Sequence, residues 1–163
     1  MDGAYCSWSG YGSNWSWGES RTGVESNSDR IYHLALDLHG SNNNVYAITN
    51  GTVKYSGYQT ANGNYVVIEH TISNKTVYSF YAHLESCKVS SGQTVKCGDP
   101  IGIQGGTGTA CPSPHLHFSI IDKANAGGYD GYGYKSEFSG NTAYHKDMTY
   151  YNPKYVIENG KLP

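Results

Sequence analysis

Charged residues are scarce in this chain of 163 residues, where Asp, Glu, Lys and Arg together make up 15%. An average globular protein has about 25%. The 11 basic and 13 acidic side chains leave a formal charge of −2, so the chain lacks the basic excess that holds nucleic acid. No apolar run approaches the roughly 20 residues of a membrane-spanning helix. We therefore expect neither nucleic-acid binding nor a membrane span.

The composition also lacks the Glu, Lys, Ala and Leu content of a helical bundle or coiled coil. Glycine (21 residues) and tyrosine (16 residues) are abundant instead. Aromatic residues favour half-buried strands, and glycine favours the turns between them. This composition predicts an all-β protein with many turns.

Short β-branched and aromatic runs follow one another between Ile31 and Ile121. They are Val45–Ile48, Thr52–Tyr55, Tyr65–Glu69, Val77–Ala82, Thr94–Lys96, Ile101–Gln104 and Leu116–Ile121. Turn signals such as Asn50-Gly51 and Ser91-Gly92 separate them. The pattern predicts an antiparallel sheet or sandwich of hairpins, with long loops and little helix.

The two ends of the chain are less patterned. We expect residues 1–30, which include three tryptophans, to pack on the core 31–121 as part of a single domain 1–163. Residues 122–163 are polar and rich in Gly and Tyr, and we expect them to be mostly loop. Asn152–Ile157 is expected to return to the sheet or to form a short turn.

The segment Pro114–Ile120 carries two histidines at alternating positions. On a strand, Leu116 and Phe118 would enter the core while His115 and His117 project together from the other face. Imidazoles about 6–7 Å apart along a strand can serve one metal, or one metal and its bound water. The alternative is an ordinary amphipathic strand with two surface histidines.

Two further features carry the same kinds of side chain. His83 ends an aromatic run, and alternation places its side chain with Tyr81 and opposite Ala82; alone, it would be a solvent-facing strand-end histidine. His33 and Asp37 are four residues apart, roughly 13 Å in an extended chain and too far for one zinc ion. A helical turn or a bent loop would bring them together, although such a spacing also occurs by chance.

Taken together, the HxxxD pair, a histidine after an aromatic strand and the PHLHF motif resemble the lysostaphin-like metallopeptidases, also called the LytM or M23 family. The likeness extends from about His33 to Ile121, over half the chain. Supporting segments are Gly51-Thr52-Val53, Tyr65–His70, Tyr81-Ala82-His83-Leu84, Gly92–Gly102 and Gly105–Gly108. The resemblance implies a barrel-sandwich type of β fold.

The resemblance also implies one Zn²⁺ per chain, held by His33, Asp37 and His117. Three protein ligands leave a fourth position for a water whose pKa zinc lowers towards about 7. His83 and His115 would be the catalytic histidines, which accept the proton of this water, steady the oxyanion and protonate the leaving amine. Spacing alone does not choose between the two histidines of the HxH pair as the ligand.

The implied function is a zinc endopeptidase that cuts peptide stems or cross-bridges of bacterial peptidoglycan. It would act as a monomer that is secreted, extracellular or associated with the cell wall. A non-catalytic cell-wall binder or hydrolase activator is the first alternative, and a secreted module that stacks aromatic side chains on sugars is the second. The Gly98–Gly102 turn also resembles turns of lipoyl and biotinyl carrier domains, but Lys96 has no neighbouring Met.

Three positions depart from the family pattern without removing a presumed ligand. Many members have Gly at the positions of Ala35 and Ser113, and Glu at the position of Ser119. The first change affects the bend of the ligand loop, and the others affect the entry and the surroundings of the histidine strand.

The four cysteines form no CxxC motif, which argues against a zinc ribbon or a thioredoxin-type site. Their even number and the low charge favour an exported protein with disulfides. Cys87 and Cys97 flank a span suited to a hairpin, which leaves Cys6 to pair with Cys111. The alternatives are four free thiols, or Cys111 as an extra metal ligand near the HxH pair. The start of the chain has neither a cationic nor an apolar stretch, so we expect a removed leader or another export route.

Overall fold

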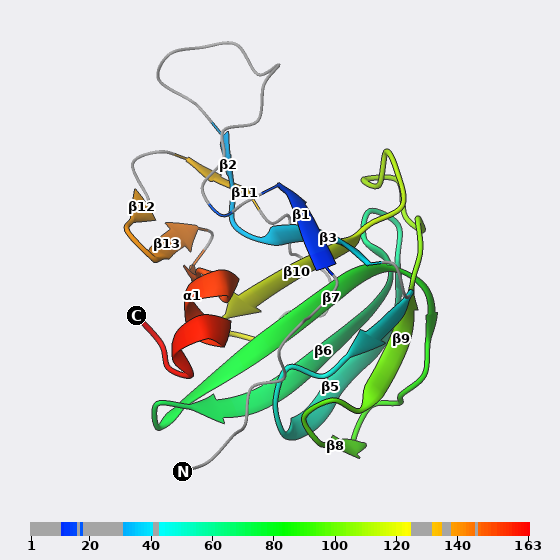
Figure 1. Cartoon of the computed structure of the whole chain (residues 1–163), viewed down its shortest axis with the longest axis horizontal. Helices are drawn as coiled ribbons and strands as arrows, with labels where there is room; N and C mark the ends of the chain where they lie inside the picture. The colour runs from blue at the N-terminus through cyan, green and yellow to red at the C-terminus, as the bar shows by residue number, and fades with distance from the viewer. Residues whose placement is uncertain are drawn as a thin grey trace.

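A computed structural model describes residues 11–15, 17, 31–40, 43–124, 132–134, 138–145 and 147–163 (Figure 1). Strands dominate this part of the chain. They are β1 (Tyr11–Trp15), β2 (Ile31–His33), β3 (Leu36–Gly40), β4 (Asn44–Tyr46), β5 (Gly51–Gln59), β6 (Gly63–Ile72), β7 (Lys75–Cys87), β8 (Thr94–Val95), β9 (Pro100–Gln104), β10 (Leu116–Ile121), β11 (Tyr132–Tyr134), β12 (Phe138–Ser139), β13 (Thr142–His145) and β14 (Met148–Tyr151). Helix α1 spans Pro153–Asn159.

Within these residues, 12 strands form one sheet whose main path runs β12-β13-β14-β10-β7-β6-β5-β8. Strand β3 pairs with β10 and carries β1 on its other edge, while β9 pairs with β7 and β4. Strands β2 and β11 form a separate pair. The long, curved strands β5, β6 and β7 make up the body of the molecule, and β10 lies beside β3 (Figure 1). The antiparallel all-β prediction is confirmed.

Each of the seven predicted runs overlaps one of the strands β4 to β10. The β6–β7 connection is a two-residue turn at Ser73 and Asn74, which both have positive φ (52° and 59°). Positive φ at both central residues matches the twist of the flanking strands, as in a type I′ hairpin. Local turn chemistry and strand alternation therefore agree over this part of the chain.

Two hydrophobic clusters cover the two faces of the sheet. Val77 and Tyr81 of β7 belong to the first cluster, whereas Phe80 and Ala82 belong to the second. In β10, Leu116, Phe118 and Ile120 enter the first cluster, as alternation predicts. The opposite face of β10 is not exposed to solvent, because all six residues of the strand are buried. The histidine-bearing face is therefore an interior surface.

The described part of residues 122–163, which we expected to be mostly loop, contains the strands β11 to β14 and helix α1. Strands β13 and β14 extend the sheet from β10, and their side chains Ala143, Met148 and Tyr150 complete the second cluster. Alternation over such short strands is hard to recognise in a segment rich in Gly and Tyr.

The expectation of a strand or turn at Asn152–Ile157 is wrong, since Pro153–Asn159 is helical. The Asn152 side chain accepts a hydrogen bond from the Lys154 amide at 3.1 Å, and Gly160 ends the helix in the left-handed conformation. An N-cap Asn, a Pro at the first helical position and a Gly at the end form a recognisable helix signature. No helix in the described ranges is long and apolar enough to cross a membrane.

The predicted packing of the N-terminal segment is visible in part. Strand β1 pairs with β3. Trp17 packs against the second cluster, and its indole N–H donates to the carbonyl of Gly140 at 3.2 Å. Trp8 lies outside the described residues.

Both predicted disulfide pairs are wrong, because Cys87 and Cys111 are free thiols and each pair contains one of them. Cys87 lies opposite Gly102 in the β7–β9 ladder. Cys97 follows β8, which pairs with β5 instead, so the two cysteines do not face each other across a hairpin. Cys6 lies outside the described residues.

Candidate metal centre

The register of β3 against β10 places two candidate ligands side by side. His117 is the direct cross-strand partner of Asp37, and its Nδ1 atom lies 3.0 Å from the Asp37 Oδ1 atom. His117 also pairs with Ala82 of β7 on its other side, so the strand that carries it is fixed from both edges. Pairing of residues far apart in the sequence thus builds the centre of the site.

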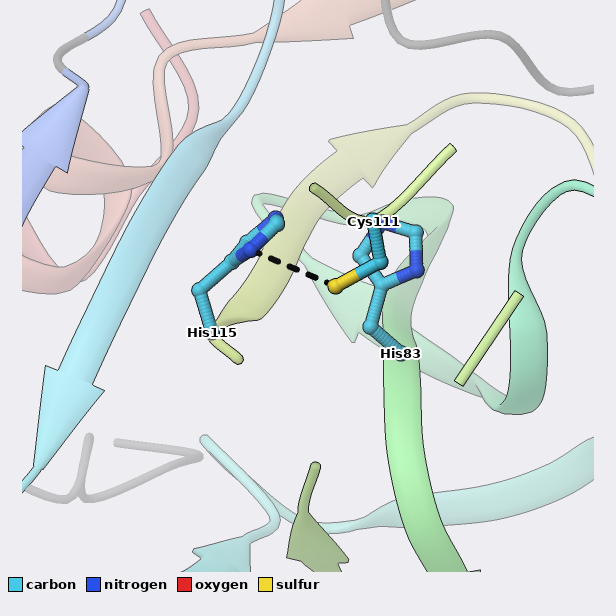
Figure 2. A group of neighbouring side chains, drawn as sticks. All are labelled: His83, Cys111 and His115. Carbon is cyan, nitrogen blue, oxygen red and sulfur yellow. Dashed lines mark hydrogen bonds between the residues drawn. The ribbon is translucent and has the colours of Figure 1, made fainter. Parts of the chain in front are cut away.

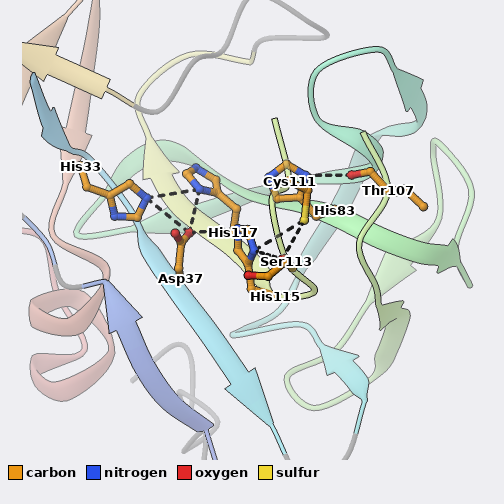
Figure 3. Close-up of polar contacts among 8 residues, drawn as sticks. All are labelled: His33, Asp37, His83, Thr107, Cys111, Ser113, His115 and His117. Carbon is orange, nitrogen blue, oxygen red and sulfur yellow. Dashed lines mark hydrogen bonds and ion pairs between the residues drawn. The ribbon is translucent and has the colours of Figure 1, made fainter. Parts of the chain in front are cut away.

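His33 reaches the same point because the chain bends at Ala35, between β2 and β3. The His33 Nε2 atom lies 3.3 Å from Asp37 Oδ1 and 3.4 Å from His117 Nδ1. The bent-loop alternative is therefore the one that the structure contains. Figure 3 shows the three side chains pointing towards one another. We call His33, Asp37 and His117 the primary group.

The spacing of the primary group fits a metal ion. Nitrogen and oxygen ligands at about 2.0–2.1 Å from a tetrahedral zinc lie about 3.3 Å from one another. The three ligand atoms are separated by 3.0, 3.3 and 3.4 Å. Two imidazoles and one carboxylate are also a donor set that catalytic zinc sites use, since it leaves one coordination position open. The chemistry and the geometry of these residues are thus both suitable for zinc.

Electrostatics keep Asp37 and His117 in their ligand forms. Burial lowers the pKa of His117 to about 4, although Asp37 opposes this shift. Burial raises the pKa of Asp37, but hydrogen bonds and charge interactions with His117 and His33 outweigh it and hold that pKa well below its usual range. At neutral pH the His117 imidazole is neutral and the Asp37 carboxyl is ionised, as metal binding requires.

His83 faces the primary group because of its backbone conformation. Its φ is +62°, in the left-handed region that non-glycine residues rarely adopt. Strict alternation would place its side chain with Tyr81 towards the first cluster. Instead its ring centroid lies 4.8 Å from that of His115 and 6.0 Å from that of His117. The sequence-based placement of the His83 side chain was therefore wrong, and the cause is a local bulge.

A backbone carbonyl determines which nitrogen of His83 is protonated. The His83 Nδ1–H donates to the carbonyl oxygen of Thr107 at 2.9 Å, because a carbonyl can only accept. The Nε2 atom then carries the lone pair. Thr107 lies over Gly63, whose φ is +66° and where an added Cβ would overlap the Thr107 carbonyl group. Burial also lowers the pKa of His83, which favours the neutral imidazole.

His115 lies just before β10 and is held by its backbone amide, which donates to the carbonyl of Gly105 at 3.1 Å. Its Nδ1–H donates to the carbonyl of Ser113 at 2.7 Å. Its Nε2 atom lies 3.5 Å from the Asp37 carboxylate, so the remaining lone pair faces the primary group. His83 and His115 therefore resemble each other, since a backbone carbonyl binds one nitrogen and leaves the other available.

Two backbone groups around these histidines were not anticipated from the sequence, whereas Cys111 near His115 was one of the alternatives. The carbonyl groups of Thr107 and Ser113 orient His83 and His115. The Cys111 thiol lies 3.6 Å from the His115 Nδ1 atom. Carbonyl oxygens carry no sequence signal, whereas the sequence position of Cys111, four residues before His115, had suggested the contact.

The remaining histidines lie apart from the primary group. His70 is buried, with Nδ1 2.8 Å from the Asn50 carbonyl and Nε2 2.7 Å from the Ser79 hydroxyl. The ring of His39 is 6.2 Å from that of His115, between centroids. His145 is buried near the end of β13.

The fold and the site together define an all-β domain in which two histidines and one carboxylate are spaced to hold a metal ion, a donor set that hydrolytic metalloproteins use. Residues 31–128 match the profile of peptidase family M23. The chain belongs to this family.

Two relatives show the range of proteins with similar sequences. The chain is 40% identical over 77 residues to the peptidoglycan DD-endopeptidase ShyC of Vibrio cholerae, covering 47% of this chain and 17% of ShyC. It is 32% identical over 117 residues to the murein hydrolase activator NlpD of Escherichia coli, covering 70% of this chain and 30% of NlpD. The chain thus spans less than a third of the length of these relatives.

Solved structures show the same fold. The catalytic domain of the antimicrobial peptidase lysostaphin from Staphylococcus simulans superposes with a TM-score of 0.58 and 25% identity, covering 71% of this chain and 84% of that domain. A zinc-containing peptidase from Vibrio cholerae gives a TM-score of 0.52 and 28% identity over 64% of this chain and 32% of that one.

Proposed function

We propose that the protein is a zinc-dependent endopeptidase that hydrolyses peptide stems or cross-bridges of bacterial peptidoglycan. The observation that carries this proposal is the convergence of the primary group at tetrahedral spacing, with His83 and His115 beside it. The similarity to a peptidoglycan DD-endopeptidase and to the lysostaphin catalytic domain supports the substrate class. Since peptidoglycan lies outside the cytoplasm, we place the protein there as a secreted or cell-wall-associated monomer.

In this proposal the primary group holds one Zn²⁺ through His33 Nε2, Asp37 Oδ1 and His117 Nδ1. When bound, zinc polarises the carbonyl of the scissile peptide and lowers the pKa of a water molecule towards neutrality. The low pKa of Asp37 and of His117 means that neither side chain has to lose a proton at neutral pH before it binds the ion.

His83 and His115 carry out the proton transfers. Each has its Nδ1–H bound to a backbone carbonyl and its Nε2 lone pair available. Either one can therefore accept the proton of the attacking water at Nε2 without rotating, and return it from the same atom to the leaving amine. The protonated imidazole also donates to the oxyanion that forms at the scissile carbonyl. A rigid Nδ1–H bond keeps this geometry throughout the reaction.

A non-catalytic activator is the second candidate, because the relative NlpD matches 70% of this chain. An activator requires a binding surface but neither a metal-binding group nor two oriented imidazoles. The presence and convergence of all five side chains favour the enzyme.

The deciding experiment measures bond cleavage directly. Purified protein with one equivalent of Zn²⁺ is incubated with intact peptidoglycan, and the released fragments are identified by mass spectrometry. We expect new peptide termini with the wild type and none with His115→Ala, although that variant keeps its zinc. Zinc-loaded wild type that releases nothing by itself, but accelerates a separate cell-wall hydrolase, would establish the activator instead.

A further inference from the structure

A second set of metal-ligating side chains lies next to the primary group. His83, Cys111 and His115 each offer one ligand atom, and the three atoms lie within 4.8 Å of one another. Figure 2 shows the Cys111 thiol between the two imidazoles. This secondary group shares no residue with the primary group. We propose that it is a second zinc site, and that its occupation inhibits the protein.

The distance between two of its ligands already matches a metal complex. A zinc ion with a sulfur ligand at about 2.3 Å and a nitrogen ligand at about 2.05 Å separates these atoms by about 3.6 Å in tetrahedral geometry. The Cys111 Sγ atom lies 3.6 Å from the His115 Nδ1 atom. Thiolate and imidazole are the ligand types that zinc binds in cysteine- and histidine-containing sites.

Two hydrogen-bond donors converge at this point. The Cys111 thiol donates to the Ser113 carbonyl at 3.0 Å, and the His115 Nδ1–H donates to the same oxygen at 2.7 Å. One cation can replace both donated protons. The Cys111 proton leaves to solvent, and the His115 proton moves from Nδ1 to Nε2, which keeps the ring neutral. The Ser113 carbonyl oxygen then becomes a further oxygen ligand within reach.

His83 completes the secondary group without giving up a contact. Its Nδ1–H is bound by the Thr107 carbonyl at 2.9 Å, so Nε2 has the free lone pair. The His83 and His115 ring centroids are 4.8 Å apart, and small side-chain rotations bring both nitrogens to one ion. A backbone partner on the distal nitrogen is the usual arrangement for a metal-bound histidine.

The two groups differ in the protons that they must release. The ligand atoms of the primary group already lie at tetrahedral spacing, whereas the Cys111 thiol proton is held by the Ser113 carbonyl at 3.0 Å. Metal binding to the secondary group must displace this proton, which weakens its apparent affinity. The primary group therefore fills first, and the secondary group fills only when metal is in excess.

Inhibition follows from the identity of the ligands and rests on the proposed function. A cation bound to His83 takes up its Nε2 lone pair, and a cation at His115 Nδ1 leaves the ring proton on Nε2, so neither Nε2 atom can accept the proton during hydrolysis. Activity should therefore be highest near one equivalent of zinc and fall at higher concentrations. Cys111 would then make the activity sensitive to the supply of free zinc.

Cobalt provides a test of the site that does not depend on activity. The 163-residue chain, loaded with one equivalent of Zn²⁺, is titrated with Co²⁺. We expect one further equivalent to bind, with a thiolate-to-cobalt absorption band in the near ultraviolet. Cys111→Ser should lose the band, whereas Cys87→Ser, which removes the other described free thiol, should keep it. The absence of the band from the wild type, or its persistence in Cys111→Ser, would overturn the proposal.

Two further measurements separate this site from the proposed function. His33→Ala, which damages the primary group, should lose one equivalent of metal but keep the cobalt–thiolate band. For inhibition, the ratio of hydrolysis at excess zinc to hydrolysis at one equivalent is compared within each variant. We expect this ratio to fall about tenfold or more in the wild type, as proton transfer is lost, and to stay near one in Cys111→Ser. Equal inhibition of both proteins would contradict the inhibitory role, while a protein without peptidase activity still gives the cobalt result.

Discussion

Two buried histidines, His70 and His117, differ in the atoms that their ring nitrogens contact. His70 and His117 are both almost fully buried, and burial lowers the pKa of each to about 4. The His70 nitrogens each face one oxygen, from Asn50 and Ser79, at 2.8 and 2.7 Å. The His117 Nδ1 atom instead faces a carboxylate and a second imidazole, at 3.0 and 3.4 Å.

The comparison shows that neither burial nor a low pKa identifies a metal ligand. A histidine whose nitrogens each meet a single oxygen is a structural crosslink, in this case between the loop before β5 and strand β7. A histidine whose nitrogen meets other ligand atoms at about 3.3 Å is poised for an ion. The direction of the ring nitrogens, which depends on the register of distant strands, makes the difference.

The largest expected effect distinguishes these two histidines by metal content. His117→Ala should lose its bound zinc and all peptide hydrolysis, because two remaining ligands do not hold the ion. His70→Gln should keep one zinc per chain after dialysis, since His70 contacts no member of the primary group. Elemental analysis of both variants provides the measurement. Full zinc content and activity in His117→Ala would show that the ligands were assigned wrongly.

A smaller effect is expected for the histidines beside the primary group. His83→Ala and His115→Ala should each keep one zinc and lose about 10²- to 10⁴-fold in turnover, the usual contribution of a positioned acid–base group. The measurement is kcat at equal zinc loading. Loss of zinc from either variant would instead make that histidine a ligand.

The pH dependence of stability gives a third test of the comparison. In the unfolded chain His70 has a pKa of about 6.5, whereas in the folded protein its pKa is about 4. Between these values the unfolded state binds a proton that the folded state does not. Stability therefore falls as the pH drops from about 6.5 to 4, by about 3 kcal/mol in total from His70.

His70→Gln removes this contribution, while the other histidines titrate in both proteins. The difference in free energy of unfolding between wild type and variant should shrink as the pH falls. Urea unfolding at several pH values measures it. Parallel pH profiles for the two proteins would mean that His70 does not oppose protonation.

The smallest effect is expected on the fold itself. Chelation should abolish activity and leave the circular dichroism spectrum unchanged, because two hydrophobic clusters hold the sheet without a metal. The free energy of unfolding should fall only by the linkage term of the lost ion. Loss of the β-sheet signal on chelation would show that the primary group is also a folding centre.

The sequence predicts the central strands well and the site only in part. The strands between Val45 and Ile121 are short alternating runs with turn signals, so local rules identify them. The approach of His33 to Asp37 depends on a bend at Ala35, and the direction of His83 depends on one left-handed residue. No residue type at either position demands the conformation, so the spacing left the first geometry open and alternation placed His83 on the wrong face.

The cysteines and the C-terminal strands show a second limit. Sequence separation suggested a hairpin between Cys87 and Cys97, but β9 and not β8 pairs with the end of β7. Strand pairing over long separations is not visible in local patterns. The strands β12 to β14 are two to four residues long, too short for alternation to be distinguished from loop.

The contact between Gly63 and Thr107 has a consequence for engineering. Thr107 receives the Asn64 amide on its hydroxyl oxygen at 3.0 Å and gives its own hydroxyl proton to Leu84 at 2.6 Å, so its carbonyl is anchored from both sides. Gly63, the first residue of β6, leaves room for Thr107, and the Thr107 carbonyl in turn fixes the tautomer of His83. Any loop exchange between β5 and β6 must therefore retain glycine at position 63 to keep the His83 tautomer.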